Sequence, residues 1–295
     1  MPPKKKKVKK NIKFTEDPVE KKKKKNGQPD FRIYGIRKEE EFMEIDRELP
    51  RPLETLVEKN GGVIAIFAPP GSGKSNFISN LLLRDDFLKD LFIGGLFIIS
   101  PTIENDLTSV HLRKYADFTS TEYSEELVSA IFNNVLEQDN DERELSCLLL
   151  DDCLGQIKQT SICNRIASTC RHNKQVVIFS LQALKGLPPT IRSNVSHSII
   201  FYQPSTKQLN DIVELHSNMG GEETFKSLYD EATAQKYGFL LCDWRDMKAY
   251  KWGAELPEPT EIWSRYDEDG NINKDTVEPL SKTPVNTDLK VETNK

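Results

Sequence analysis

A glycine-rich stretch that ends in lysine and serine carries the strongest chemical signal in this chain. Residues 68–75 read A-P-P-G-S-G-K-S and follow directly after the apolar run at 63–67. Gly71 and Gly73 leave the backbone free to fold so that successive N–H groups converge on phosphate oxygens. Lys74 is placed to reach the β and γ phosphates of a nucleoside triphosphate, and the Ser75 hydroxyl can bind Mg²⁺ where the next helix begins. The pattern therefore predicts an ATP site formed by these consecutive residues: Ala68, Pro69, Pro70, Gly71, Ser72, Gly73, Lys74, Ser75 and Asn76.

The alternative interpretation of this stretch is a Gly/Pro turn that contains a lysine by chance. The flanking sequence favours the phosphate loop, because an apolar strand precedes it and apolar residues at helical spacing follow it. One residue departs from the usual pattern, since Ala68 stands where most such loops have glycine. Alanine fits this position if its φ angle is negative.

Two carboxylates follow another apolar run, at 147–150. In a parallel sheet Asp151 and Asp152 would lie at the carboxyl edge, where ligands of open α/β sheets bind. We expect Asp151 to complete the Mg²⁺ environment with Ser75, and Asp152 to orient or deprotonate the attacking water. The alternative is that two aspartates simply open a turn. The separate phosphate loop on an earlier strand favours the catalytic interpretation.

A glutamine follows the next apolar run, at 176–180. Gln182 could hydrogen-bond the γ-phosphate or the attacking water and so report hydrolysis to the rest of the fold, with Ser180 as the second candidate. The alternative is that Gln182 caps the loop that follows, as glutamine often does.

Two arginines could stabilise the charge that accumulates during phosphoryl transfer. Arg171 closes the helix expected before the strand at 176–180, and Arg192 lies in the segment 187–194. Either could act within its own subunit or on a neighbouring one. The alternative for each is an ordinary surface cation near a helix end.

Alternating strands and helices are expected to position these residues. The pattern predicts strands at 63–67, 96–100, 145–150, 176–180 and 198–202, helices at 122–138, 162–172, 208–216 and 222–234, and a hairpin of strands at 237–243 and 247–252. Strands that are apolar on both faces favour an α/β fold with a mostly parallel central sheet, helices on both faces and a C-terminal edge hairpin.

The charge of the chain is unevenly distributed. Residues 1–25 carry 12 lysines and a local charge of +9, which leaves −14 for the rest of a chain whose net charge is −5. We expect a disordered lysine-rich arm at 1–25, a lead-in segment at 26–60, an ATPase domain at 61–254 and a polar flexible tail at 255–295. The arm could be a nuclear-import signal, a nucleic-acid tether or a solubilising tail.

Composition argues against several other classes of protein. No apolar run approaches the roughly 18 residues that span a bilayer, so an intracellular protein without membrane partners is expected. The five cysteines form no C-x-x-C pair and lack the spacing of a zinc site, which favours reduced thiols.

Taken together, six motifs resemble the virion DNA-packaging ATPases of large DNA viruses, the poxvirus-type branch of the FtsK/HerA superfamily of P-loop NTPases. The motifs are G-S-G-K-S-N at 71–76, I-I-S-P-T at 98–102, L-L-L-D-D at 148–152, C-R-H-N-K at 170–174, S-L-Q at 180–182 and I-R-S-N at 191–194. The phosphate loop alone is unspecific, whereas R-H-N, the glutamine after the strand and I-R-x-N discriminate better. The resemblance covers roughly residues 61–252.

This resemblance implies an ATPase that assembles as a homo-oligomeric ring and drives double-stranded DNA into a preformed capsid. It implies ATP and Mg²⁺ as cofactors, capsid or portal-like viral proteins as partners, and a location in the cytoplasm or nucleus of the host cell or in the virion. By position, Lys74 and Ser75 bind phosphates and Mg²⁺, Asp151 holds the metal, Asp152 takes the place of the catalytic acid, and Gln182 is the sensor. The superfamily also uses an arginine finger, for which Arg171 and Arg192 are candidates. Aspartate at 152 is one methylene shorter than the usual glutamate.

Two other functions remain open from the sequence. A small-molecule kinase could use the same loop, but the chain shows no arginine-rich lid segment. A nucleotide-gated assembly or scaffold protein would use ATP only to order its subunits. Because residues after 25 carry −14, contact with DNA requires local basic loops or the lysine arm.

Overall fold

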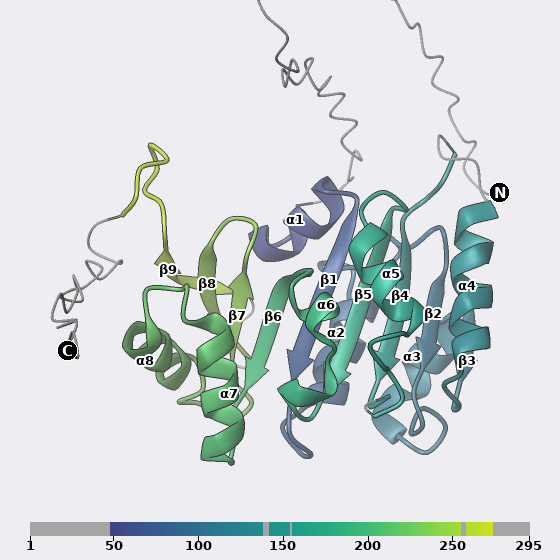
Figure 1. Cartoon of the computed structure of the whole chain (residues 1–295), viewed down its shortest axis with the longest axis horizontal. Helices are drawn as coiled ribbons and strands as arrows, with labels where there is room; N and C mark the ends of the chain where they lie inside the picture. The colour runs from purple at the N-terminus through teal and green to yellow at the C-terminus, as the bar shows by residue number, and fades with distance from the viewer. Residues whose placement is uncertain (1–47, 138–141, 154, 255–257, 274–295) are drawn as a thin grey trace, which may run out of the picture. The chain divides into compact units, whose positions relative to one another are not determined.

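The computed structural model describes residues 48–137, 142–153, 155–254 and 258–273, and these form one nine-stranded sheet with helices on both faces (Figure 1). The predicted arm at 1–25, most of the lead-in segment and the end of the predicted tail lie outside the described residues. No helix among the described residues is long and apolar enough to cross a lipid bilayer.

The strand order across the sheet is β3-β2-β4-β5-β1-β6-β7-β8-β9. The strands are β1 (Gly61–Phe67), β2 (Leu96–Ile99), β3 (Phe118–Ser120), β4 (Ser146–Asp151), β5 (Gln175–Leu181), β6 (Val195–Phe201), β7 (Phe239–Asp243), β8 (Lys248–Trp252) and β9 (Thr260–Ser264). The six strands from β3 to β6 pair in parallel, and β7, β8 and β9 continue the sheet antiparallel. The predicted mostly parallel α/β class is confirmed.

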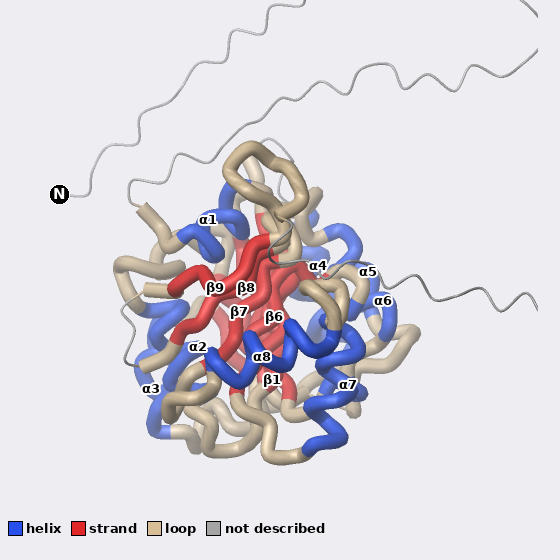
Figure 2. The backbone as a smooth tube through the Cα atoms, turned by 90° about the vertical axis from the view of Figure 1, so that its left-hand side faces the viewer, coloured by secondary structure: helices blue, strands red, loops and turns tan. Residues whose placement is uncertain are grey.

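Each face of the sheet has its own hydrophobic core, because alternate residues of β1 point to opposite sides. Val63, Ala65 and Phe67 join one cluster, and Ile64 and Ile66 join the other. The first cluster packs under α4 (Glu125–Glu137), α5 (Ile162–Thr169), α6 (Pro189–Arg192), α7 (Thr206–His216) and α8 (Glu222–Ala232). The second packs under α1 (Arg51–Glu58), α2 (Lys74–Leu83) and α3 (Val110–Tyr115). Figure 2 shows the sheet between these two groups of helices.

Two ends of the domain differ from the expectation. The lead-in segment contains α1, which starts with Pro52 in its first turn and buries Leu53, Leu56 and Val57 against the sheet. The segment expected as a flexible tail contains β9, which pairs with β8, so the β7–β8 hairpin does not form the sheet edge. Trp263 of β9 is only 4% exposed and belongs to the first core. Burial of this aromatic side chain stabilises the pairing of β9 with β8, although most of the surrounding segment is polar.

Candidate functional site

The phosphate loop begins where β1 ends, in the middle of the sheet. Ala68 donates its N–H to the carbonyl oxygen of Leu181 at 2.9 Å, which ties the start of the loop to the end of β5. The φ angle of Ala68 is negative, and its side chain is fully buried in the second core. Alanine therefore meets the backbone requirement at this position, and its methyl group adds to the packing.

The two glycines of the loop do need their conformational freedom. Gly71 has φ 76° and Gly73 has φ 95°, both in the left-handed region that residues with a Cβ rarely adopt. Gly73 also precedes α2, whose first N–H groups point back toward the loop. A Cβ at Gly73 would lie 3.1 Å from the ring of Tyr237, so an aromatic side chain from a distant part of the chain closes against the loop here.

Lys74 and the two aspartates meet at the carboxyl edge of the sheet. Lys74 Nζ lies 3.0 Å from Asp151 Oδ1 and 2.7 Å from Asp152 Oδ2. Asp151 is also held by Ser180, whose Oγ donates to Oδ1 at 2.6 Å, and by Ser100, whose Oγ donates to Oδ2 at 2.8 Å. These contacts come from the ends of β2, β4 and β5, which are neighbours in the sheet. The carboxylate of Asp151 is therefore fixed from two sides.

Asp152 occupies an unusual backbone conformation. Its φ angle is 51°, in the left-handed region, while its N–H donates to the carbonyl oxygen of Ser180 at 3.1 Å. Gln182 Nε2 lies 3.4 Å from Asp152 Oδ1, so the expected sensor and the expected base are neighbours. Non-glycine residues held in this region are often found at functional sites.

Several hard oxygen donors stand where Mg²⁺ was expected. Ser75 and Asp151 line one small cavity of about 10 Å³ together with Ser100, Ser109 and four aliphatic side chains, and Ser75 also faces the larger cavity described below. The described residues contain no cluster of three or more His, Cys, Asp or Glu side chains that could hold a metal alone. Mg²⁺ in nucleotide sites takes one or two carboxylates and completes its shell with phosphate oxygens and water, so these residues fit the ion.

Asp106 is a site residue that the sequence analysis missed. It accepts hydrogen bonds from Ser75, from the N–H and hydroxyl of Thr108, and from the hydroxyl of Ser109. Burial alone would raise its pKa, but these hydrogen bonds outweigh burial and lower the pKa of Asp106. It therefore remains a carboxylate beside the Ser75 hydroxyl. The one sequence signal for it was local: aspartate is a preferred N-cap residue, and Asp106 caps the short turn Leu107–Ser109.

A cavity of about 750 Å³ opens beside the loop. Its lining includes loop residues, the side chains of Asp106, Asp152 and Gln182, and residues of β6, β7 and β8. Its volume lies within the range of small-molecule sites, roughly 300–1,000 Å³. Triphosphate-binding and catalytic candidates thus share one space.

Arg171 and Arg192 lie away from this cavity. Arg171 precedes Gln175, the first residue of β5, and Arg192 precedes Val195, the first residue of β6. Both parallel strands run from these starts toward the phosphate loop, over seven residues or roughly 20 Å. The two arginines therefore do not meet the Lys74–Asp151–Asp152 cluster of their own subunit.

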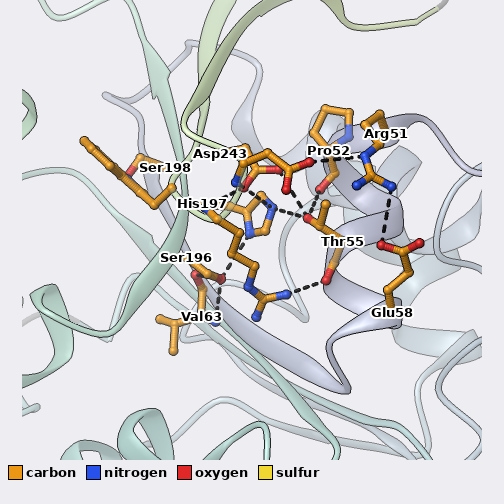
Figure 3. Close-up of polar contacts among 12 residues, drawn as sticks. Arg51, Pro52, Thr55, Glu58, Val63, Ser196, His197, Ser198 and Asp243 are labelled. Carbon is orange, nitrogen blue, oxygen red and sulfur yellow. Dashed lines mark hydrogen bonds and ion pairs between the residues drawn. The ribbon is translucent and has the colours of Figure 1, made fainter. Parts of the chain in front are cut away.

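The strand-start edge also carries a buried polar network, shown in Figure 3. Thr55 of α1 hydrogen-bonds His197 of β6 at 2.9 Å and Asp243 of β7 at 3.3 Å. The neighbouring Arg245 donates to the carbonyl oxygens of Thr55 and Gly61. Burial is the main reason why the pKa of Arg245 is lowered, and the charge of nearby Arg171 adds to the effect.

A hydroxyl, an imidazole and a carboxylate in a row have the composition of a hydrolytic triad. Thr55, His197 and Asp243 are at most 1% exposed, so no substrate reaches them. Arg51 extends the same network to Asp246 at 3.1 Å. The network fastens α1 and the β7–β8 turn to the sheet.

The five cysteines are buried and free of disulfide bonds, as expected. Cys153 lies next to the acidic pair, and burial raises its pKa to about 12. Its thiol is protonated at neutral pH and takes no part as a nucleophile.

Comparisons with known proteins identify related sequences and similar folds. Residues 54–229 match the family described as Poxvirus A32 protein. Uncharacterized protein 075L of Invertebrate iridescent virus 6 is 29% identical over 209 residues, covering 67% of this chain and 77% of that protein. The solved DNA-packaging ATPase B204 from Sulfolobus turreted icosahedral virus superposes with a TM-score of 0.48 at 17% identity, covering 66% of this chain and 98% of that one. B204 from Sulfolobus turreted icosahedral virus 2, in complex with ATP-gammaS, superposes with a TM-score of 0.48 at 16% identity, covering 67% of this chain and 99% of that one.

Proposed function

Because the chain belongs to the Poxvirus A32 protein family, we propose that it is an ATP-hydrolysing motor of viral genome packaging, which moves double-stranded DNA into a preformed capsid. The observation that carries the proposal is the meeting of Lys74, Asp151 and Asp152 at the end of the phosphate loop, with Gln182 beside them. The packaging part rests on the family and on the six motifs of the sequence.

Each residue of the cluster has a role in this proposal. The loop N–H groups and Lys74 hold the β and γ phosphates, and Ser75 and Asp151 hold Mg²⁺, with Asp106 beside Ser75. When bound, Mg²⁺ neutralises charge that develops on the phosphate oxygens. Asp152 orients the attacking water and accepts its proton, and Gln182 contacts the same carboxylate and senses the γ-phosphate.

The positions of the two arginines support action between subunits. An arginine at the sheet edge opposite the phosphate loop of its own subunit can reach a bound phosphate only in a neighbouring subunit. In a ring, each subunit has such a neighbour. We assign Arg171 and Arg192 as the candidates for this role. Infected host cells, in the cytoplasm or nucleus, provide the DNA and capsid partners, and the lysine-rich arm at 1–25 is the candidate for non-specific DNA contact.

ATPase assays with Lys74→Ala, with and without duplex DNA, test the proposal. We expect the turnover of the wild type to rise when duplex DNA is added. The turnover of Lys74→Ala should be about a hundredfold below that of the wild type, because one electrostatic contact to the reacting group is lost. Lys248→Ala is the matched control. Lys248 is the first residue of β8, at the end of that strand far from the phosphate loop, and it forms a surface ion pair with Glu261 at 2.8 Å.

An unchanged rate in Lys74→Ala would contradict the mechanism. The assembly or scaffold function would replace the motor if nucleotide changed the oligomer size while turnover stayed at background with DNA present. A small-molecule kinase would show transfer of phosphate to an added acceptor without any response to DNA.

A further inference from the structure

The nucleotide cavity continues beyond the phosphate loop into an aromatic region. Six of the 21 residues that line the cavity are aromatic, whereas aromatic residues make up only 8% of the whole chain. The cavity is therefore enriched in aromatic side chains. The six residues are Phe77, Phe87, Phe201, Tyr237, Phe239 and Trp252. The triphosphate-binding loop accounts for none of them except Phe77, which follows it on α2.

Four of these aromatic side chains form a rigid floor. Phe87, Phe201, Phe239 and Trp252 are each at most 4% exposed. Phe77 packs edge-on against this floor, with ring centres 4.8 Å from Phe239, 5.9 Å from Trp252 and 6.0 Å from Phe201. Edge-to-face contacts of this kind fix ring orientation. Phe77 and Tyr237 are the members of the set that retain solvent-exposed surface.

Tyr237 lies at the junction of the aromatic region and the phosphate loop. It is 44% exposed, and its ring is the group that a Cβ at Gly73 would meet at 3.1 Å. Its φ angle is 65°, a left-handed conformation that costs free energy for a bulky residue. Gly253 makes room for this loop, because a Cβ there would lie 3.0 Å from the carbonyl oxygen of Tyr237. The backbone is thus held in an unfavourable conformation that places an exposed ring beside the loop.

We propose that the aromatic end of the cavity is a nucleobase subsite, in which Tyr237 stacks on the base and Phe77 contacts it from α2. This inference deepens the proposed function and rests on it, because the base belongs to the triphosphate that the loop holds. A flat, apolar and π-rich ligand group next to bound phosphates is what a nucleoside triphosphate offers. An exposed aromatic ring binds such a group by stacking, and this is worth most where the ring is preorganised.

The polar residues around the aromatic end suit the rest of a nucleoside. Asn76, Asn80 and Arg84 line the same cavity. Asn80 Nδ2 donates to Asn76 and Arg84 pairs with Asp86, so these polar side chains are held in place where ring nitrogens, carbonyl oxygens or ribose hydroxyls would lie. Lys236 Nζ lies 4.8 Å from the centre of the Tyr237 ring and adds a positive charge at this side of the loop. The cavity thus combines a stacking surface with groups that can bind the edge of a base.

Calorimetric titrations of the full chain with a non-hydrolysable ATP analogue and, separately, with inorganic tripolyphosphate test the subsite. Tripolyphosphate carries the phosphates without the base. We expect Tyr237→Ala to weaken binding of the ATP analogue by about tenfold and to leave tripolyphosphate binding unchanged. Tyr237→Phe should bind both ligands like the wild type, because it keeps the ring. Tyr266→Ala is the matched control, since Tyr266 is similarly exposed at 41% and does not line the cavity.

The other outcomes overturn the subsite. Equal weakening of both ligands in Tyr237→Ala would mean that the ring only supports the loop at Gly73. Unchanged binding of both would mean that the ring contacts no part of the nucleotide. Failure of the proposed function is distinguishable, because it would appear as unchanged binding of both ligands in Lys74→Ala, whatever Tyr237→Ala does.

Discussion

His216 is an imidazole buried in the first core, where no solvent reaches its ring. Its Nδ1 lies 2.7 Å from the carbonyl oxygen of Ile212, and the ring stacks on Phe225 with centres 5.2 Å apart. Burial lowers its pKa to about 4, from an ordinary value of 6.5. The native protein thus keeps this side chain neutral under conditions in which an unfolded chain would protonate it.

The stability of the domain should therefore fall as the pH drops through this interval. Between pH 6.5 and about 4 the unfolded state binds more protons than the native state, so the stabilisation is complete above 6.5 and is lost below it. From pH 7.5 to pH 5, we expect His216 to account for a loss of about 2 kcal/mol in the free energy of unfolding, measured in urea. His216→Phe should lose less over the same interval, while His111→Gln, which removes an exposed histidine of α3, should match the wild type. Equal losses in His216→Phe and wild type would contradict this account.

At the scale of elements, β9 extends the sheet with a strand that has little apolar sequence. Thr260 and Glu261 are exposed, Ile262 is partly buried against the first core, and Trp263 alone is fully buried. Lys248 of β8 pairs with Glu261 of β9 at 2.8 Å on the surface. The strand therefore depends on one aromatic side chain more than on the pairing of its charges.

Trp263→Ala should destabilise the domain by about 3–5 kcal/mol, as loss of a buried aromatic side chain usually does. The free energy of unfolding from urea titrations measures this loss. Glu261→Ala on the same strand is the control, and it should change stability by less than about 1 kcal/mol because the pair is exposed. A Trp263→Ala variant as stable as the wild type would show that β9 adds nothing to the fold.

At the scale of the whole molecule, the two ends of the parallel strands hold different groups of the candidate catalytic residues. The carboxyl ends carry Lys74, Asp151 and Asp152, whereas Arg171 and Arg192 lie where strands begin. A single copy of the chain cannot bring both sets together without unfolding its sheet. The arrangement favours a head-to-tail assembly, in which one copy's loop faces the next copy's arginines.

Mixing of inactive variants tests this arrangement. Lys74→Ala and the finger variant, Arg171→Ala or Arg192→Ala, should each be inactive alone, and part of the DNA-stimulated ATPase activity should return when they are mixed. Rescue occurs because some interfaces then combine an intact loop with an intact arginine. A mixture of Lys74→Ala with Asp152→Asn is the control and should stay inactive, since both residues belong to one subunit's site. Absence of rescue with either arginine would contradict action between subunits.

Strong apolar runs made most of the fold predictable. The runs at 63–67, 147–150 and 176–180 all became central strands, because strands buried on both faces carry an unbroken apolar signal. The segments that were missed have short or polar sequences: α1 in the lead-in segment, the short helices α3 and α6, β3 with three residues, and β9 in the expected tail. Their formation depends on tertiary contacts that a local pattern does not contain.

The candidate site was predictable to a similar extent. Lys74, Asp151 and Asp152 come together as expected, because each follows a strand that ends at the same edge. Asp106 carries only the local signal of an N-cap and Tyr237 carries none, so only the folded chain brings them to the cavity. The roles of these residues in catalysis stay predictions.

The left-handed backbone of Asp152 has a consequence for how this protein can change. Glycine would adopt a φ angle of 51° without strain, whereas an aspartate there costs the fold roughly 1 kcal/mol. Both codons for aspartate differ from a glycine codon by one nucleotide. A single point mutation could therefore relieve this strain, but it would remove both the proposed base and its ion pair with Lys74, so the carboxylate and the strained backbone are kept or lost together.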